Sequence, residues 1–375
     1  MIQQQFRPTP AKSHYTYNLR DVSKIFQGIA KASPKAIKTE NDMIKLWAHE
    51  CLRVFSDRLI SEADHEKFLT LLKDQIKEKF KKDWSSIVEV EPIMFGSFVP
   101  MIYPDGDNTK KPLNDIYCEL TDRKKLKDQA ESSLLDYNQF NHSKKMNLVL
   151  FNAAIEHIVK VHRVITTEFG HALLVGVGGS GRKSLTQLAT FIAMFDNFQI
   201  EIAKNYGFKE WRDDMKEKLY MSAGIDQKQT VFMFSDTQIT LEAFVEDLNN
   251  ILNGGIIPNL YTEAEEITNI IDLMKDANKN IAAFKNFSDG EVMNDFLTKA
   301  KTNIHLVLTM SPIGEDFKRR LRMFPSLVNC CTIDWFLPWP KEALQSVAEY
   351  FLNQVELENR EGIISICVDM QERVS

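Results

Sequence analysis

The chain has 375 residues, of which 44% are hydrophobic, enough for about two domains with buried cores at the usual ~150 residues each. Its formal net charge is −6, so it lacks the basic excess that binds a nucleic-acid backbone, and we expect no nucleic-acid partner. The five cysteines form no C-x-x-C pair, and no histidines cluster at zinc-ligand spacing. We expect reduced thiols of an intracellular protein at Cys51, Cys118, Cys330, Cys331 and Cys367.

The N-terminal residues lack the apolar stretch of a signal peptide, and no run of about 18 apolar residues occurs in the chain. We therefore expect a protein that is neither secreted nor membrane-spanning.

Helical periodicity dominates residues 1–83, which we expect to form a small helical domain. A second helix is predicted over residues 43–60, and a third begins near His65. The first predicted helix, residues 19–29, has its apolar positions on one face at Leu19, Val22, Ile25, Phe26 and Ile29.

Residues 84–125 change in character, with four prolines, a Pro-Asp-Gly turn at 104–106 and scattered aromatic residues. This pattern predicts a connecting segment. The prolines are Pro92, Pro100, Pro104 and Pro112.

Residues 126–340 are predicted to form an α/β domain with a parallel sheet between helices, because short apolar strands alternate with helices after a helical stretch at 146–165. In such sheets ligands bind just beyond the carboxyl ends of the strands. Residues 341–375 would begin another helical domain. The predicted strands are residues 172–175, 231–234, 304–309 and 327–333.

A glycine-rich loop follows the first predicted strand and precedes a predicted helix at 185–195. Strand, glycine loop and helix are the context of a phosphate-binding loop, in which backbone N–H groups and the helix N-terminus converge on phosphate oxygens. The sequence therefore predicts a nucleotide site here, although a glycine-rich turn without a ligand is the alternative. The loop reads Gly176, Val177, Gly178, Gly179, Ser180, Gly181, Arg182, Lys183, Ser184.

The loop departs from the pattern Gly-x-x-x-x-Gly-Lys-Ser/Thr. With Gly176 and Gly181 as the two glycines, Arg182 replaces the lysine and Lys183 the hydroxyl that ligates Mg²⁺. Shifting the register by one makes Lys183 and Ser184 the functional pair but puts Val177 and Arg182 where glycines are needed. We adopt the first register, in which Arg182 supplies the positive charge.

Asp236 follows the predicted strand 231–234 and is the candidate to hold Mg²⁺ through its water shell. In hydrolytic relatives of this fold the next residue is a glutamate that activates water, and here it is Thr237. Asp236 could instead cap the helix predicted over 241–252.

Two further features follow the strand predicted at 304–309. Ser311 is a candidate sensor of the γ-phosphate, although a turn-forming serine before Pro312 is an equal alternative. Arg319, Arg320 and Arg322 form a cationic cluster with Lys318. This cluster is either a solvated helix face or a source of arginine fingers for a neighbouring module.

Residues 170–182 (GHALLVGVGGSGR) and 324–336 (FPSLVNCCTIDWF) resemble the fourth AAA+ module of axonemal dynein heavy chains. Residues 8–21 (PTPAKSHYTYNLRD), with WAHE at 47–50 and RVF at 53–55, resemble the helical lid of the third module. Because a whole heavy chain is far longer, the resemblance implies a fragment that joins the lid of one module to the large domain of the next.

The resemblance also implies roles for individual residues. Arg20 would be the second sensor of the third module, and Leu148 and Val149, within MNLVLF at 146–151, would face the adenine. The cluster at Arg319, Arg320 and Arg322 would serve the preceding module. Expected ligands are ATP or ADP with Mg²⁺. Expected partners are the other AAA+ modules of the heavy chain, microtubules, and dynein intermediate and light chains, in the cytoplasm, the cytoskeleton and the ciliary axoneme.

Two functions are compatible with these features: a nucleotide-binding regulatory module of the motor, and an active ATPase within its ring. Lys183 and Thr237 favour the first, because the hydroxyl ligand and the water-activating carboxylate are both missing. An unrelated phosphate-loop protein would leave the matches at both ends of the chain unexplained.

Overall fold

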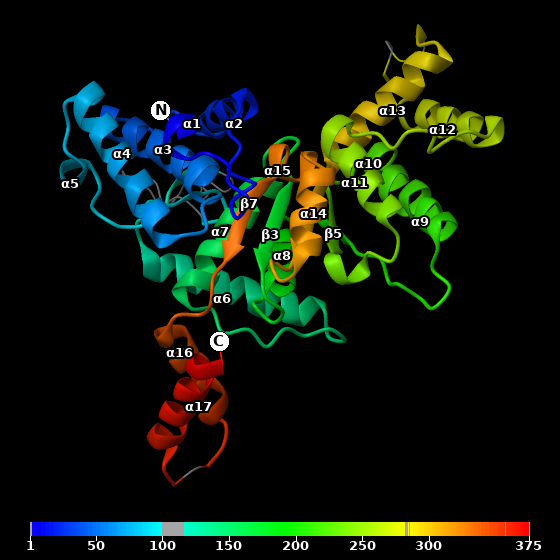
Figure 1. Cartoon of the computed structure of the whole chain (residues 1–375). Coiled ribbons are helices and arrows are strands. Elements are labelled where there is room, and N and C mark those ends of the chain that lie inside the picture. Colours follow the sequence, from blue (N-terminus) through cyan, green and yellow to red (C-terminus); the bar gives the residue numbers. More distant parts are fainter. Residues whose placement is uncertain (1, 100–115, 282–283, 285, 357, 375) are drawn as a thin grey trace, which may run out of the picture.

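The computed structural model describes residues 2–99, 116–281, 284, 286–356 and 358–374 (Figure 1). A group of N-terminal helices packs beside an α/β body, from which a pair of C-terminal helices extends (Figure 1). The prolines at 100, 104 and 112 and the turn predicted at 104–106 lie outside the described residues.

Side-chain caps fix the starts of the N-terminal helices. Asn18 and Asp21 form a reciprocal capping box, as do Thr39 and Asp42, and Ser61 caps the next long helix. The three predicted helices are present, but the second begins at residue 40 and passes into a π-helical turn at residue 52. The elements are α1 (Ile2–Gln5), α2 (Leu19–Ala30), α3 (Glu40–Cys51), the π-helix η1 (Leu52–Ser56), α4 (Glu62–Phe80) and α5 (Trp84–Ile87).

The apolar positions predicted on one face of α2 are largely exposed. Leu19 and Phe26 are 86% and 66% exposed, whereas Ile25 is buried. The helix instead buries Asp21, whose carboxylate accepts a hydrogen bond from Arg58 Nη2 at 2.8 Å. It also presents Gly28 so closely to Glu50 that an added Cβ would lie 1.9 Å from Glu50 Oε2.

The body contains a five-stranded parallel sheet, so the predicted α/β fold is confirmed. The strand order is β4-β5-β6-β3-β7. A separate antiparallel pair, β1 (Phe95–Gly96) and β2 (Cys118–Glu119), lies in the segment before the body. The parallel strands are β3 (Ala172–Gly176), β4 (Asp196–Phe198), β5 (Thr230–Ser235), β6 (Ile304–Met310) and β7 (Thr332–Phe336).

Helices cover both faces of the sheet (Figure 1). One face is covered by α6 (Arg123–Phe140), α7 (Asn152–Ile165) and α8 (Arg182–Ile192). The other helical elements of the body are α9 (Phe208–Asp214), the π-helix η2 (Met215–Tyr220), α10 (Met221–Gly224), the 3-10 turn η3 (Asp236–Gln238), α11 (Glu242–Gly254), α12 (Ala264–Ala277), α13 (Asp289–Asn303), α14 (Glu315–Met323) and α15 (Ser326–Asn329).

The alternation of strand side chains divides the body into two cores. Leu173 and Val175 of β3 enter the core shared with α9 to α11, and Ala172 and Leu174 enter the core shared with α6 to α8. Both faces of β3 are therefore dry, which is usual for a strand in a parallel sheet.

The strand predicted at 327–333 is wrong in its first half. Ser326–Asn329 forms α15, in which Leu327 and Val328 are buried, and the strand runs from Thr332 to Phe336. Pro325 precedes the helix with φ −64°, a value suited to a helix start, and its carbonyl accepts hydrogen bonds from the backbone N–H groups of Val328 and Asn329. A short buried apolar run fits either a strand or a helix, so periodicity alone did not distinguish them.

Two smaller differences concern α7 and the C-terminal residues. The helix predicted over 146–165 begins only at Asn152. After Pro340 the chain forms α16 (Lys341–Leu352) and α17 (Arg360–Val374), which pack on each other. In the part of the chain that the structure describes, no helix has the length and apolarity needed to cross a membrane.

Buried histidines are expected to make the fold sensitive to acid. Burial lowers the pKa of His171 to about 3, and His171 Nδ1 accepts a hydrogen bond from the Leu306 backbone N–H at 3.0 Å. An unfolded histidine titrates near ~6.5, so below that pH the unfolded chain binds more protons and stability falls. We expect His171 alone to lower the free energy of unfolding by about 1–2 kcal/mol between about pH 7 and about pH 5, measured by urea denaturation with circular dichroism.

Substitutions at a buried and an exposed histidine provide the controls. His171→Asn keeps an acceptor at the same place without a titrating ring and should flatten part of the pH profile, whereas the same change at exposed His142 should leave the profile unchanged. A native profile that is flat over this range would contradict the expectation. The other buried histidines with a lowered pKa are His14, His49, His162 and His305.

Candidate nucleotide-binding site

The glycine-rich loop leaves the sheet at the carboxyl end of β3 and enters α8 at Arg182. Gly179 and Gly181 have φ values of 80° and 88°, which side chains other than glycine adopt at a cost. A Cβ added to Gly178 or Gly179 would meet nothing within 4 Å, so the backbone of the loop has an open side. A curled backbone with an open side next to a helix N-terminus can donate several N–H groups to one anion.

Arg182 folds back over this loop. Its Nη1 donates to the carbonyl of Met310, at the end of β6, at 2.6 Å, and its Nη2 donates to the Val177 carbonyl at 3.2 Å. Burial lowers the pKa of Arg182, and the nearby charge of Asp236 partly offsets that effect. The Lys183 side chain is exposed and Ser184 is half-buried. Arg182 is thus the cation held at the loop.

Asp236 lies directly after β5 and begins η3. Its Oδ2 accepts a hydrogen bond from the Ser311 backbone N–H at 2.6 Å, and its Oδ1 accepts one from Ser235 Oγ at 3.3 Å. Because β5 and β6 are neighbours in the sheet, their carboxyl ends bring these predicted residues together. Thr237 Oγ1 lies 3.0 Å from Ser235 Oγ.

Ser180 occupies the inner side of the loop. Its hydroxyl is buried and has no hydrogen-bond partner among the residues that the structure describes. A buried hydroxyl without a partner is costly, so this side chain could donate a hydrogen bond to an anion held by the loop. Arg182, Asp236, Ser311 and the glycines thus meet at one edge of the sheet.

A metal at this edge would have one carboxylate from the protein. Within residues 2–99, 116–281, 284, 286–356 and 358–374, no group of three or more His, Cys, Asp or Glu side chains could hold a metal ion. Mg²⁺ commonly binds through one or two carboxylates together with waters and substrate phosphates, so Asp236 fits a metal that arrives with a nucleotide.

The remaining predicted site residues are Leu148, Val149, Arg20 and the arginines of α14. Leu148 and Val149 are half-buried in the extended segment before α7, where Leu148 packs on the core of α6 to α8. The hydrogen bonds of the described residues do not connect these two to the loop. Arg20, on α2, donates to Cys330 Sγ at 3.3 Å, between α15 and β7.

The cationic cluster on α14 is partly paired within the chain. Glu242 Oε1, at the start of α11, accepts from Arg319 Nη2 at 2.9 Å and from Arg320 Nη2 at 3.2 Å. Arg319 also pairs with Asp316 at 3.1 Å, and Arg322 is exposed. Two of the three arginines are therefore held by an acidic residue that sequence analysis did not single out.

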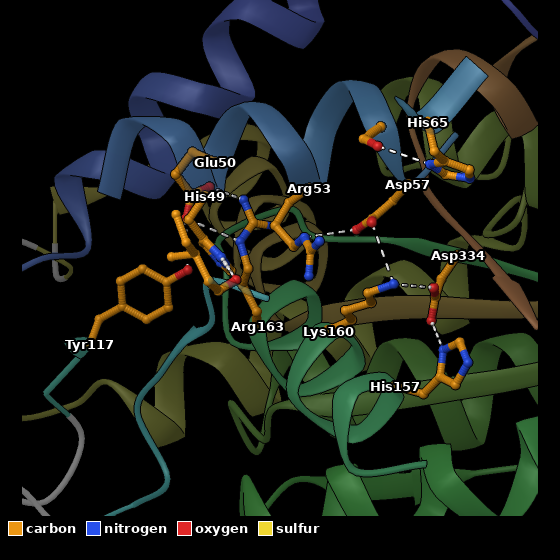
Figure 2. A network of polar contacts seen from close by, with 12 residues as sticks. His49, Glu50, Arg53, Asp57, His65, Tyr117, His157, Lys160, Arg163 and Asp334 are labelled. Atoms are coloured by element: carbon orange, nitrogen blue, oxygen red, sulfur yellow. Dashed lines mark hydrogen bonds and ion pairs between the residues drawn. The ribbon is translucent and has the colours of Figure 1, made fainter. Parts of the chain in front are cut away.

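Sequence analysis also missed two buried ionic groups where the N-terminal helices meet the body (Figure 2). In one, Glu50 accepts hydrogen bonds from Arg163 and from the Tyr117 hydroxyl. In the other, Lys160 bridges Asp57 and Asp334. The only signal was the presence of two cations, Lys160 and Arg163, on the helix that became α7.

The loop conformation predicts different effects for alanine substitutions at two neighbouring glycines, which have similar space around them but different backbone angles. Gly178→Ala and Gly179→Ala both place a methyl group in open space, but only Gly179 has a positive φ. We expect Gly179→Ala to lower the free energy of unfolding by about 1–2 kcal/mol and Gly178→Ala to leave it nearly unchanged. Denaturant titrations of both variants would test this, and equal effects would show that the loop has a different conformation.

Two models of known protein families match this chain. A family model described as "P-loop containing dynein motor region D4" matches residues 146–375, and one described as "AAA+ lid domain" matches residues 1–90. Human dynein axonemal heavy chain 1 is 45% identical over 381 aligned residues, covering 100% of this chain and 8% of the relative.

Two other axonemal dynein heavy chains are also similar to this chain over nearly its whole length. Human dynein axonemal heavy chain 6 is 42% identical, with 98% of this chain and 9% of the relative covered. Mouse dynein axonemal heavy chain 2 is 43% identical, with 96% of this chain and 8% of the relative covered. The chain thus spans less than a tenth of the length of these relatives. The chain belongs to the family of the P-loop-containing dynein motor region and is a segment homologous to axonemal dynein heavy chains.

Proposed function

We propose that residues 176–184 bind ATP or ADP and that this module has a regulatory or structural role in a dynein motor ring, with little hydrolysis. The observation that carries the proposal is the open-sided glycine loop between β3 and α8, at the same sheet edge as Arg182, Asp236 and Ser311. Backbone N–H groups and the N-terminus of α8 would bind the phosphate oxygens.

Arg182 would add positive charge, in exchange for one of its bonds to backbone carbonyls. Asp236 would hold Mg²⁺ through its water shell, and the ion would neutralise part of the phosphate charge. Ser311, next to Asp236, would lie on the γ-phosphate side. Leu148 and Val149 are proposed to face the adenine.

Weak hydrolysis is proposed because two groups are missing. Lys183 replaces the hydroxyl ligand of Mg²⁺, and Thr237 replaces the carboxylate that would activate water. Losing a general base alone typically costs on the order of 10²–10⁴ in rate. Asp236 remains, so nucleotide could be held with little turnover. An active ATPase of the same motor is the alternative.

The role of the whole protein is also a proposal, because this chain spans less than a tenth of its relatives. We propose a ciliary motor that moves on microtubules in the axoneme, with intermediate and light chains as partners. Arg20 and the cluster at Arg319, Arg320 and Arg322 would complete the site of the preceding module. A structure of the ring with all three cluster guanidinium groups in solvent, far from that site, would contradict this assignment.

Nucleotide binding can be tested with two neighbouring cations. We expect the chain to bind fluorescent mant-ADP and Arg182→Ala to bind it at least about tenfold more weakly, because a charge-assisted bond contributes about 1.5–3 kcal/mol. Lys183→Ala is the matched control and should change the affinity by less than about twofold, given the exposed Lys183 side chain. A larger effect at Lys183 would favour the shifted register, and no binding by the native chain would refute the proposal.

Hydrolysis can be tested by restoring the missing groups. We expect Lys183→Thr combined with Thr237→Glu to release phosphate at least about tenfold faster than the native chain in single-turnover assays, since a metal ligand and a base are regained. Lys183→Thr with Thr237→Gln has similar side-chain size but no base and is the control. Native turnover equal to that of the restored variant would support the active ATPase instead.

A further inference from the structure

One ammonium group joins the N-terminal helices to the sheet (Figure 2). Lys160 Nζ, on α7, lies 3.3 Å from Oδ1 of Asp57, in the turn after η1. It also lies 3.2 Å from Oδ1 of Asp334, on β7. Arg53 Nε holds the other oxygen of Asp57 at 3.0 Å. The bridge therefore links two segments that are far apart in sequence.

The bridge is largely buried and charged. Asp57 and Asp334 are 8% and 4% exposed, and the cavity beside them has a volume of only about 10 Å³, room for a single water at most. Burial tends to raise the pKa of Asp334, but the charges of His157 and Lys160 outweigh that effect and hold the pKa well below its ordinary value. Because space for water beside the bridge is so limited, separating Asp57 from Lys160 would leave a largely buried charge without its partner, and the remaining charges would rearrange.

The rearrangement would reach the phosphate loop through two aromatic rings. His157 Nδ1 lies 2.6 Å from Asp334 Oδ2, and its ring stacks on Phe336 with centroids 3.8 Å apart and planes at 10°. Phe336 pairs with Gly176 across β7 and β3. A Cβ added to Gly176 would lie 2.8 Å from Phe336 Cβ and 3.1 Å from Ser180 Oγ. Phe336 thus packs directly against the first glycine of the loop.

We infer that Asp57, Lys160, Asp334 and His157 are positioning residues, through which docking of the N-terminal helices sets the backbone of the loop at residues 176–181. This inference rests on the proposed nucleotide site. Displacing those helices withdraws Asp57, which changes how Lys160 and His157 hold Asp334 and Phe336. Close packing passes such shifts to the loop, since the cavity beside the bridge is only about 10 Å³ and Phe336 packs directly against Gly176. By linkage, nucleotide at the loop would equally favour the docked position of the helices.

The test compares two carboxylates of the N-terminal helices in the 375-residue chain. Asp57→Asn should speed hydrogen exchange of the loop amides at 176–181 without nucleotide, and weaken mant-ADP binding by about five- to twentyfold. Asp64→Asn is the matched control, because Asp64 pairs with Lys12 and Tyr15 within the N-terminal segment and not with α7. It should change neither readout. Equal changes in both variants would reduce the effect to general destabilisation and overturn the inference.

A double-mutant cycle tests whether the effect of Asp57 on the loop passes through Lys160. In a Lys160→Met background, Asp57→Asn should have no further effect on loop exchange or on binding, and a full effect there would overturn the inference. Lys160→Gln replaces Lys160→Met if that variant does not fold. If the native chain binds no mant-ADP, the proposed function fails, and the loop-exchange measurements alone decide the inference.

Discussion

The burial of β3 between β6 and β7 is the constraint on which the site depends. Both faces of this strand are covered, and parallel neighbours occupy both of its edges, so the chain can meet a ligand only where the strand ends. At that end the glycines let the backbone turn into α8. The next strands end at the same edge, which brings Asp236 and Ser311 beside Arg182 without any long side chain having to reach across the molecule.

The same constraint explains why the N-terminal helices matter to the body. Asp334 belongs to the edge strand β7 and is buried, so it needs the partners Lys160 and His157 from α7. Lys160 pairs with Asp334 and also with Asp57 from the N-terminal part of the chain. Glu50 and Arg163 repeat the arrangement nearby. Buried ion pairs often contribute little net stability, but removing one partner is costly, so these pairs favour one docked position over others.

The sequence predicted the features that depend on neighbouring residues. The loop, the strand before Asp236 and the strand before Ser311 each combine a short apolar run with a local turn or polar residue, and the structure has them where they were expected. The predicted roles of the site residues remain proposals. The run at Leu327 and Val328 became a helix because tertiary packing, and not periodicity, decides the conformation of a short apolar segment.

Features that depend on distant partners could not be predicted. Arg163 meets Glu50 across 113 residues, and Lys160 meets Asp334 across 174. Nothing near either cation in the sequence marks it as buried. The exposure of the apolar face of α2 also depends on distant partners. Asp21 accepts a hydrogen bond from Arg58 and Gly28 packs against Glu50, and these contacts set the rotation of the helix.

Phosphate release from the assembled motor ring, with bound nucleotide quantified in parallel, tests the chemistry of this site most directly when the native protein is compared with Asp236→Ala. A site that holds nucleotide with little turnover predicts that the substitution leaves most of the hydrolysis of the ring intact. If Asp236→Ala removed a substantial share of the turnover while nucleotide stayed bound, the site would be an active ATPase with unusual residues.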